Sequence, residues 1–203
     1  MSIKAVIFDL DGTITKPYFD FDAIREEMRL DKNAGPVLEA MEKMTPSECL
    51  NAERILLYHE QKALEESQLN DSAKETLTRL REMGILIGIL TRNTKENAYT
   101  IANKHGLQFD AVVGREEGPV KPDAFGVIHL CRQFGVEPQE TLLVGDYLFD
   151  LICAKSAGAI AVLLANHRKA DEFEKNADYR IEKISQVIDI IKNEKQCLVE
   201  RQL

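Results

Sequence analysis

Acidic side chains recur in this sequence at the points where strongly apolar segments end. Asp9 and Asp11 follow the first such segment, and Asp146 follows a later one, with Asp150 one helical turn further on. Several carboxylates that converge on one point repel each other unless a cation neutralises them. A hard cation held by oxygen atoms meets this need, and Mg²⁺ prefers one or two carboxylates together with water and a phosphate oxygen. The acids therefore predict a magnesium site if the fold brings them together.

A hydroxyl group and two cationic side chains complete a set suited to phosphate chemistry. Thr91 and Arg92 follow another apolar segment, and Lys121 directly precedes Pro122. The lysine ammonium is a compact charge that can bind a phosphoryl oxygen. Arg92 is a second candidate for contact with phosphate or substrate because of its place beside Thr91, although a solvent-exposed arginine without a role is an open alternative.

The elements that must position these groups can be read from the apolar pattern. Short, nearly continuous apolar runs predict strands buried on both faces of a parallel sheet, at residues 4–9, 85–90, 111–113, 141–144 and 159–164. Segments with helical periodicity alternate with them and end at Gly84, Gly106, Gly135 and Gly158. This alternation predicts an α/β fold with a doubly wound, Rossmann-like parallel sheet. Ligands of such sheets bind beyond the carboxyl ends of the strands, where the candidate residues all lie.

Two helix starts are predicted from local signals in this part of the chain. Ser72 and Glu75 have the spacing of a capping box, in which each side chain binds the main chain of the other residue. Lys121 and Pro122 are expected to open the helix that follows the third strand.

One stretch interrupts the alternation with helices alone. Residues 15–70 contain no convincing strand, and helical patterns occupy 21–30, 36–44 and a long segment from 46. Thr45 is the expected N-cap of the third helix, with Glu48 completing a capping box. We therefore expect an α/β core formed by residues 1–14 and 71–203, with a helical insertion at 15–70.

Composition and charge narrow the possible partners and the compartment. The 203 residues carry a net charge of −8. An acidic surface repels nucleic-acid phosphates and anionic lipids, so neither is an expected partner. A phosphorylated substrate would need a cation that reverses the local sign. The four cysteines are scattered without a CxxC pair and are expected to be small buried side chains. With no signal peptide and no long apolar run, the expected compartment is the cytoplasm.

The motifs taken in order resemble those of a known family. The segment Asp9-Leu-Asp-Gly-Thr13, then Thr91, then Lys121-Pro122, and finally Gly145-Asp-x-x-x-Asp150 match the four motifs of the haloacid dehalogenase (HAD) superfamily. The resemblance spans residues 4 to about 165. The helical insertion after the first motif is similar to the small helical cap of the subclass that includes phosphoglycolate phosphatase and β-phosphoglucomutase.

The resemblance implies a role for each matching residue. Asp9 would be the nucleophile that forms an aspartyl-phosphate, and Asp11 the general acid that later activates water. Lys121 would offset charge on the phosphoryl group, while Thr91 and nearby amides would bind its oxygens. Mg²⁺ would be held by the Asp9 carboxylate, the Asp11 carbonyl and Asp146, with Asp150 acting through water or by orienting Lys121.

The resemblance predicts a Mg²⁺-dependent phosphatase that acts on a small phosphorylated metabolite, as a monomer or a homodimer. Phosphoglycolate is the first candidate substrate. A dehalogenase is disfavoured because halide release needs no acid at the position of Asp11. Two alternatives stay open: a phosphomutase of the β-phosphoglucomutase type, which would share every core residue, and a non-catalytic phospho-acceptor module.

Overall fold

The chain forms two compact units in the computed structural model, which describes residues 2–31 and 33–200 and the side chains up to residue 194. Tyr18–Ser67 forms one unit, called here the helical unit. Met1–Pro17 and Gln68–Leu203 form the other, called the core unit.

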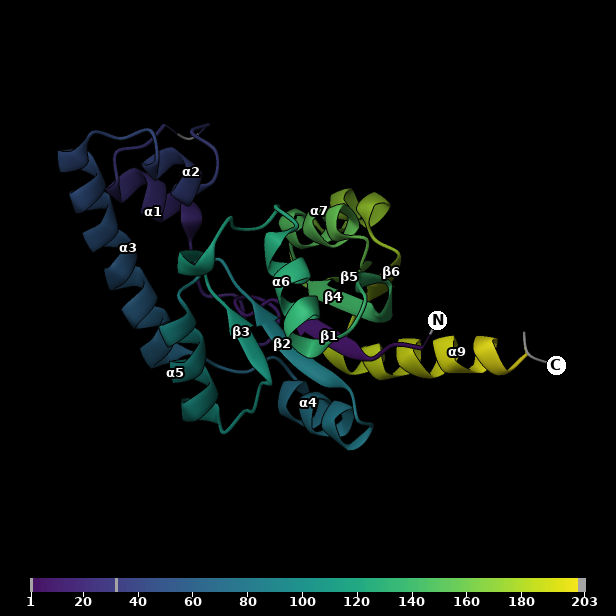
Figure 1. Cartoon of the computed structure of the whole chain (residues 1–203). Helices are drawn as coiled ribbons and strands as arrows, with labels where there is room; N and C mark the ends of the chain where they lie inside the picture. Colours follow the sequence, from purple (N-terminus) through teal and green to yellow (C-terminus); the bar gives the residue numbers. More distant parts are fainter. Residues whose placement is uncertain (1, 32, 201–203) are drawn as a thin grey trace. The chain divides into compact units, whose positions relative to one another are not determined.

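A six-stranded parallel sheet organises the core unit (Figure 1). Its strands lie in the order β3-β2-β1-β4-β5-β6, so the chain reverses direction across the sheet next to β1. The strands are β1 (Ala5–Phe8), β2 (Leu86–Leu90), β3 (Ala111–Val113), β4 (Thr141–Gly145), β5 (Ile160–Leu164) and β6 (Tyr179–Ile181). This arrangement confirms the predicted doubly wound α/β fold. β6 was not predicted, because three residues that include an exposed arginine at 180 carry no measurable alternation.

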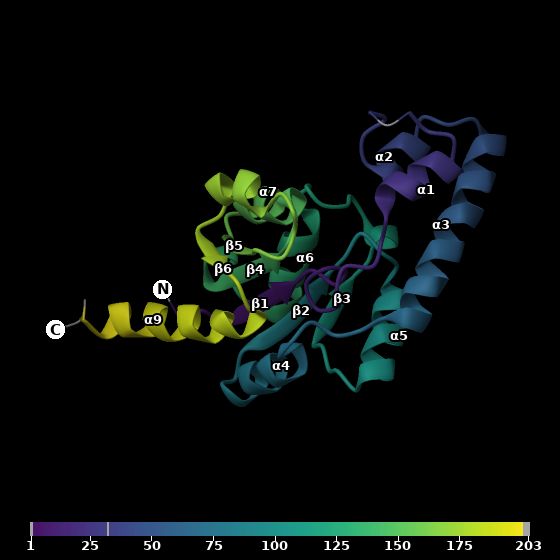
Figure 2. The same cartoon turned by 180° about the vertical axis from the view of Figure 1, so that it is seen from behind.

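Helices cover both faces of this sheet, as the two opposite views show (Figures 1 and 2). α6 (Phe125–Phe134) and α7 (Leu148–Ala157) pack against the strands through one shared apolar cluster. α4 (Ala73–Glu82) contacts both β2 and α9 (Val187–Glu200). α5 (Lys95–His105) contacts β3. Short helical segments complete the unit, at Arg115–Glu117, Pro138–Glu140, Ala170–Phe173, Glu174–Asn176 and Ile184–Gln186.

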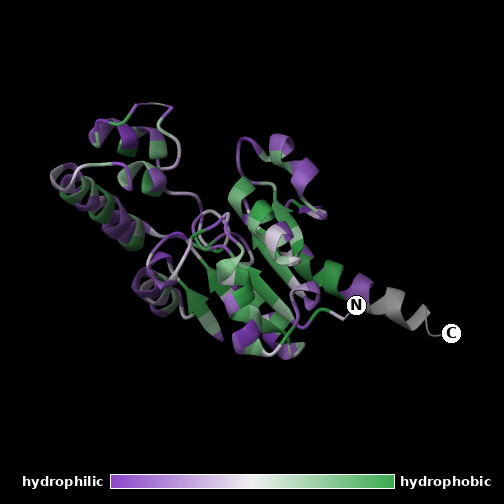
Figure 3. Cartoon of the chain, turned by 45° about the horizontal axis from the view of Figure 1, so that its top comes forward, coloured by the Kyte–Doolittle hydropathy of each residue, from purple (hydrophilic) through white to green (hydrophobic). Residues whose placement is uncertain are grey.

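The central strands of the core unit are mostly hydrophobic, as Figure 3 shows. Every residue of β1 is buried, as expected for a strand covered on both faces. The polar residues follow immediately after the last apolar residue of each central strand. The sheet interior therefore holds the strand ends rigidly in place, and these ends carry the candidate site.

The helical unit consists of three helices that pack around a separate hydrophobic core. They are α1 (Phe21–Glu27), α2 (Val37–Met41) and α3 (Pro46–Glu66). Thr45 caps α3 as predicted: its hydroxyl accepts the Glu48 N–H, and the Glu48 carboxylate accepts the Thr45 N–H at 2.9 Å. The following apolar side chains lie at the centre of this unit: Ile24, Met28, Val37, Met41, Ala52 and Leu56.

The predicted range of the insertion, 15–70, extends slightly beyond the helical unit at both ends. Thr15 and Lys16 belong to the core unit because they pair with the returning chain: Thr15 bridges Leu69, and the Lys16 N–H donates to the Gln68 carbonyl at 2.8 Å. A pattern of helix-forming residues cannot register such a pairing between segments far apart in sequence.

The structure corrects two predictions about helix starts: Ser72 is the N-cap position of α4 but forms no capping box, and the helix after β3 begins later than predicted. Ser72 adopts a left-handed conformation with φ of 64°, so its hydroxyl makes no capping hydrogen bond with α4. The helix after β3 begins at Phe125 rather than Pro122, because the Asp123 carboxylate accepts the Phe125 N–H at 2.7 Å and sets the first turn there. The Lys121–Pro122 peptide bond is cis.

Within the described part of the chain, no helix is long and apolar enough to cross a membrane. Cys131 and Cys153 are buried as expected, while Cys49 is half-buried, and all three are free thiols. The fourth cysteine, Cys197, lies outside the residues whose side chains are described.

Candidate active site

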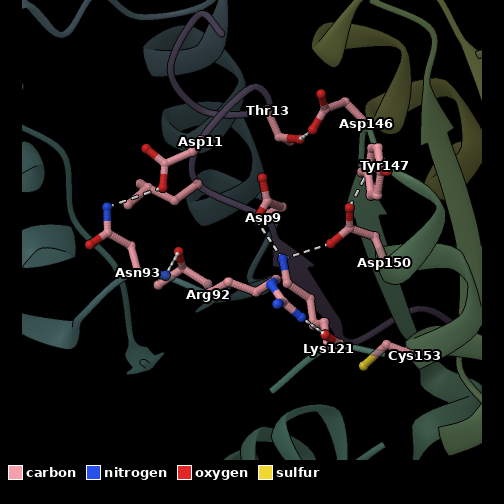
Figure 4. A network of polar contacts seen from close by, with 12 residues as sticks. Asp9, Asp11, Thr13, Arg92, Asn93, Lys121, Asp146, Tyr147, Asp150 and Cys153 are labelled. Atoms are coloured by element: carbon pink, nitrogen blue, oxygen red, sulfur yellow. Dashed lines mark hydrogen bonds and ion pairs between the residues drawn. The ribbon is translucent and has the colours of Figure 1, made fainter. Parts of the chain in front are cut away.

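The carboxyl ends of β1, β2 and β4 bring the candidate residues together. β1 pairs with β2 on one side and with β4 on the other, so Asp9, Thr91 and Asp146 leave three adjacent strands at the same edge of the sheet. All three side chains are buried. Figure 4 shows that Asp9 and Asp146 lie in the same region as Lys121 and Asp150.

Lys121 joins two of the acids. Its Nζ donates to Asp9 Oδ1 at 2.5 Å and to Asp150 Oδ1 at 2.7 Å (Figure 4). Burial lowers the stability of the charged ammonium, yet the nearby Asp150 and Asp9 carboxylates hold the pKa of Lys121 above its ordinary value. The ammonium is therefore a permanent positive charge at the centre of the site.

Asp9 carries more negative neighbours than Lys121 alone can offset. Burial raises the pKa of Asp9 well above its ordinary value, and repulsion from Asp150, Asp146 and Asp11 adds to this rise. Lys121 acts in the opposite direction. A further positive charge would favour the ionised carboxylate, which is the form that can act as a nucleophile.

Asp146 is paired with a neutral group. The Thr13 hydroxyl donates to Asp146 Oδ1 at 3.3 Å. Burial, followed by repulsion from Asp150, raises the pKa of Asp146 to about 7. Gly12 makes this approach possible, because a Cβ there would lie 2.6 Å from Asp146 Oδ2 and its φ of 99° suits only glycine.

Asp150 is held from two sides. Its second oxygen, Oδ2, accepts the Tyr147 N–H at 3.2 Å and so closes the first turn of α7. Gly145 leaves room for this carboxylate, since a Cβ there would lie 2.1 Å from the Asp150 carboxyl carbon. Asp150 therefore fixes the position of Lys121 relative to the strand ends.

Asp11 differs from the other acids because it is only half-buried. Asn93 Nδ2 donates to Asp11 Oδ2 at 3.3 Å (Figure 4). A carboxyl group at the edge of the site can exchange protons with solvent and with a leaving group, whereas Asp9 lies deeper. No role was predicted for Asn93, and the only signal for it in the sequence is its place two residues after Thr91.

Thr91 and Arg92 make contacts within the protein. The Thr91 hydroxyl accepts the Asn93 N–H at 2.9 Å. The Arg92 guanidinium donates to the Lys121 carbonyl and lies over the Phe149 ring, 5.0 Å from its centroid. The Arg92 side chain therefore binds the main chain that carries Lys121. Binding of a phosphate by Arg92 or by Thr91 stays a prediction.

The donor set fits a hard divalent cation. Asp9 and Asp146 are buried carboxyl groups whose ionised forms are disfavoured, so a cation between them would relieve the cost of their charge. Among the described residues, no three acidic, histidine or cysteine side chains form a metal site by themselves. A site of two carboxylates and one main-chain carbonyl is consistent with this finding and with the preference of Mg²⁺ for few protein ligands.

Comparison with protein families relates this chain to a known family of enzymes. Residues 3–158 match the family model of the haloacid dehalogenase-like hydrolases. The chain belongs to this hydrolase family. The match contains all four segments that hold the candidate residues, and it confirms the expectation of an enzyme of the HAD-like hydrolase family.

Individual HAD-like relatives agree with this assignment. An uncharacterized hydrolase of Saccharomyces cerevisiae is 30% identical over 200 residues, covering 94% of this chain and 92% of the relative. A phosphoglycolate phosphatase of Chromobacterium violaceum is 27% identical over 218 residues, covering 94% of this chain and 97% of that protein. The predicted resemblance to phosphoglycolate phosphatases is confirmed.

A solved structure shows the same fold. The structure of a predicted phosphoglycolate phosphatase from Haemophilus somnus superposes with a TM-score of 0.75, covering 94% of this chain and 98% of that chain. The two sequences are 22% identical, so this likeness supports the fold alone.

Proposed function

We propose that this HAD-like hydrolase is a Mg²⁺-dependent phosphatase that hydrolyses a small phosphomonoester through an aspartyl-phosphate on Asp9. The observation that carries the proposal is the pairing of Asp9 with Lys121 at 2.5 Å, with Asp11 at the same strand end. A nucleophilic carboxylate, a fixed cation and a second carboxyl group able to move protons are the parts that this reaction needs.

In the first half of the reaction, an Asp9 carboxylate oxygen attacks the phosphorus atom and forms a new O–P bond. The bond between phosphorus and the leaving oxygen breaks, and Asp11 donates a proton to that oxygen. Lys121 stabilises the negative charge on the phosphoryl oxygens, since its ammonium is already fixed by Asp150 at 2.7 Å.

In the second half, Asp11 is a carboxylate and accepts a proton from water. The water oxygen attacks the phosphorus atom, the Asp9–phosphorus bond breaks, and inorganic phosphate leaves. Asp9 returns to its carboxylate form and Asp11 to its protonated form, so the residues are ready for a second turnover.

The Asp9 and Asp146 carboxylates and the Asp11 carbonyl would hold Mg²⁺. When bound, this cation neutralises charge on the carboxylates and on the phosphoryl group. The donor chemistry supports this part of the proposal, because all the proposed ligands are oxygen atoms.

The substrate proposal is a small metabolite of the phosphoglycolate type, with the helical unit acting as a cap that selects it. Its support is the set of relatives: several are phosphoglycolate phosphatases, and a protein of Clostridium perfringens, 27% identical over 212 residues, is named a putative pyrophosphatase. Activity in the cytoplasm, as a monomer or a homodimer without nucleic acid or membrane partners, stays a prediction.

The test is phosphate release from a panel of small phosphomonoesters, with Mg²⁺ and with a chelator. We expect metal-dependent release that falls by at least about 10³-fold in Asp9→Asn and strongly in Asp11→Asn, because each removes a group that reacts. Asp189→Asn, at an exposed position on α9, is the matched control and should retain full activity.

The same experiment separates the alternatives. Transfer of the phosphoryl group to a second sugar hydroxyl without release of phosphate would favour the phosphomutase. A stable phosphorylated protein without turnover would favour the phospho-acceptor. Either result would overturn the proposed phosphatase.

A further inference from the structure

The turn that follows β1 carries Asp11 and Thr13, and its main-chain carbonyls point at one side chain. The two hydrogens of Asn70 Nδ2 are shared among the carbonyl oxygens of Gly12 at 3.0 Å, Thr13 at 2.7 Å and Thr15 at 3.2 Å. An amide oxygen in this place would face three other oxygens, so the nitrogen must point into the turn.

The main chain of Asn70 strengthens this contact. Its N–H donates to the Ile14 carbonyl at 2.9 Å. Together, the side chain and main chain of Asn70 bind four consecutive carbonyl groups, those of residues 12–15. Residues 12–15 are buried, so their carbonyl groups need donors from the protein, and the Gly12 N–H also donates to the Thr15 carbonyl at 3.1 Å.

A second asparagine reaches the same turn from another part of the core unit. Asn166, which follows β5, donates from Nδ2 to the Gly12 carbonyl at 2.6 Å. The Gly12 carbonyl thus accepts two amide hydrogen bonds, one from the segment after the helical unit and one from beyond β5. Two donors from separate segments fix the peptide plane between Gly12 and Thr13 more firmly than either does alone.

The residues on both sides of this plane belong to the proposed chemistry. Asp11 directly precedes Gly12, and the Thr13 hydroxyl binds Asp146 at 3.3 Å. A displacement of the turn at Gly12 would shift the main chain on both sides of it, and with it the Asp11 side chain and the Thr13 hydroxyl. Displacement of a reacting group by about 1 Å can lower a rate by about 100-fold.

We propose that Asn70, supported by Asn166, is a positioning residue that holds the Asp11-Gly12-Thr13 segment in its catalytic geometry. This inference rests on the proposed function, because it assigns Asp11 to proton transfer. Asn70 touches no reacting atom and acts through the main chain of the turn. It lies where the chain enters the core unit again after the helical unit, so that connection is bound directly to the turn that carries Asp11.

The experiment compares Asn70→Asp and Asn166→Asp with Asn103→Asp in the full chain. Each change keeps the shape of the side chain and replaces the donor by a carboxylate, and Asn103 is exposed on α5. With p-nitrophenyl phosphate and Mg²⁺, we expect Asn70→Asp to lower kcat by about 10- to 100-fold with KM changed by less than about threefold. Asn166→Asp should have the same effect in smaller degree, and Asn103→Asp none.

Amide hydrogen exchange provides a measurement that does not depend on activity. Peptides covering residues 9–16 should exchange faster in Asn70→Asp than in the wild-type protein, while peptides of β4 should be unchanged. A role in global stability alone would accelerate exchange in both regions and would contradict the proposal. If Asn70→Asp does not fold, Asn70→Ala removes the donor without adding charge and is measured in its place.

The two readouts separate this inference from the proposed function. Unchanged exchange at residues 9–16, or a kcat within twofold of the wild-type value in an active enzyme, would overturn the role of Asn70. If the wild-type protein hydrolyses no phosphomonoester, the proposed function fails. The proposal that Asn70 positions Asp11 for catalysis then fails as well, even if the exchange result shows that Asn70 holds the turn.

Discussion

The single ammonium group of Lys121 forms ion pairs with two buried carboxylates. Replacing it by methionine would leave Asp9 and Asp150 buried without their cation. Removal of one partner from a buried ion pair costs about 3–5 kcal/mol. We expect Lys121→Met to lower the free energy of unfolding by this amount and to abolish phosphate release, as measured by urea denaturation and by the ester assay.

A surface ion pair provides the control for this prediction. Lys155 pairs with Asp178, but the two side chains are 46% and 37% exposed. Such pairs contribute about 0–1 kcal/mol because water screens the charges. Lys155→Met should therefore change the free energy of unfolding only slightly. If Lys121→Met and Lys155→Met lowered it equally, burial would not explain the contribution of Lys121 to stability.

Asp146 makes the stability of the protein depend on pH in the absence of metal. Its pKa is raised to about 7 in the folded state, whereas the unfolded carboxyl has the ordinary value of 3.8. Between these values folding takes up a proton, so the contribution of Asp146 to the free energy of unfolding falls as the pH rises toward 7. A bound cation competes with that proton.

We therefore expect Mg²⁺ to raise the unfolding temperature more at pH 8 than at pH 6. Asp146→Asn should abolish most of this increase at both pH values, because it removes both the ligand and the titrating group. The control is Asp189→Asn, which lies exposed on α9 and should respond to Mg²⁺ as the wild-type protein does. An Mg²⁺ effect that is the same at both pH values would contradict this assignment.

At the level of the elements, two helix starts that look alike in sequence behave differently. Thr45 accepts a hydrogen bond from the main chain of α3, whereas the Ser72 side chain makes no capping bond to α4. Loss of an N-cap costs about 1 kcal/mol. We expect Thr45→Ala to lower the free energy of unfolding by about this amount and Ser72→Ala to change it by less than about 0.5 kcal/mol, in paired denaturation curves.

Equal losses in these two variants would contradict the structural difference between the two helix starts. The left-handed φ of Ser72 follows from its neighbours, since the Ala73 N–H is bound by the Asn70 carbonyl at 3.0 Å. The same Asn70 binds the turn after β1. The spacing of Ser72 and Glu75 therefore does not produce a capping box when the main chain at Ser72 is left-handed.

At the level of the whole molecule, the chain contains two units with separate hydrophobic cores. Ile24 is fully buried in the helical unit, and Leu142 is fully buried in β4 of the core unit. Truncation of such a side chain to alanine costs about 2–5 kcal/mol. Ile24→Ala should therefore accelerate amide exchange in α1, α2 and α3 while leaving the central strands protected.

Leu142→Ala is the matched control, because it should accelerate exchange in the strands of the core unit. If Ile24→Ala accelerated exchange equally in β1 and β4, the two units would unfold as one cooperative body. The result also bears on the proposed cap, since a unit that opens by itself can admit a substrate while the strand ends stay in place.

The sequence by itself predicted five of the six strands, a helical insertion and a set of residues that could do chemistry. The reason is local: buried strands need continuous apolar runs, helices end at glycines such as Gly106, and Asp9 and Asp11 lie next to the strand that carries them. The motif order then indicated the family, which the family comparison confirmed.

Only the tertiary structure decided how these groups are paired. Lys121 lies between Asp9 and Asp150, Arg92 binds the main chain of Lys121, and Asn70 and Asn166 bind the turn at Gly12. Each of these contacts joins segments that are distant in sequence. Residue spacing along the chain carries no information about them, because the packing of the sheet and its connections determines which distant side chains meet.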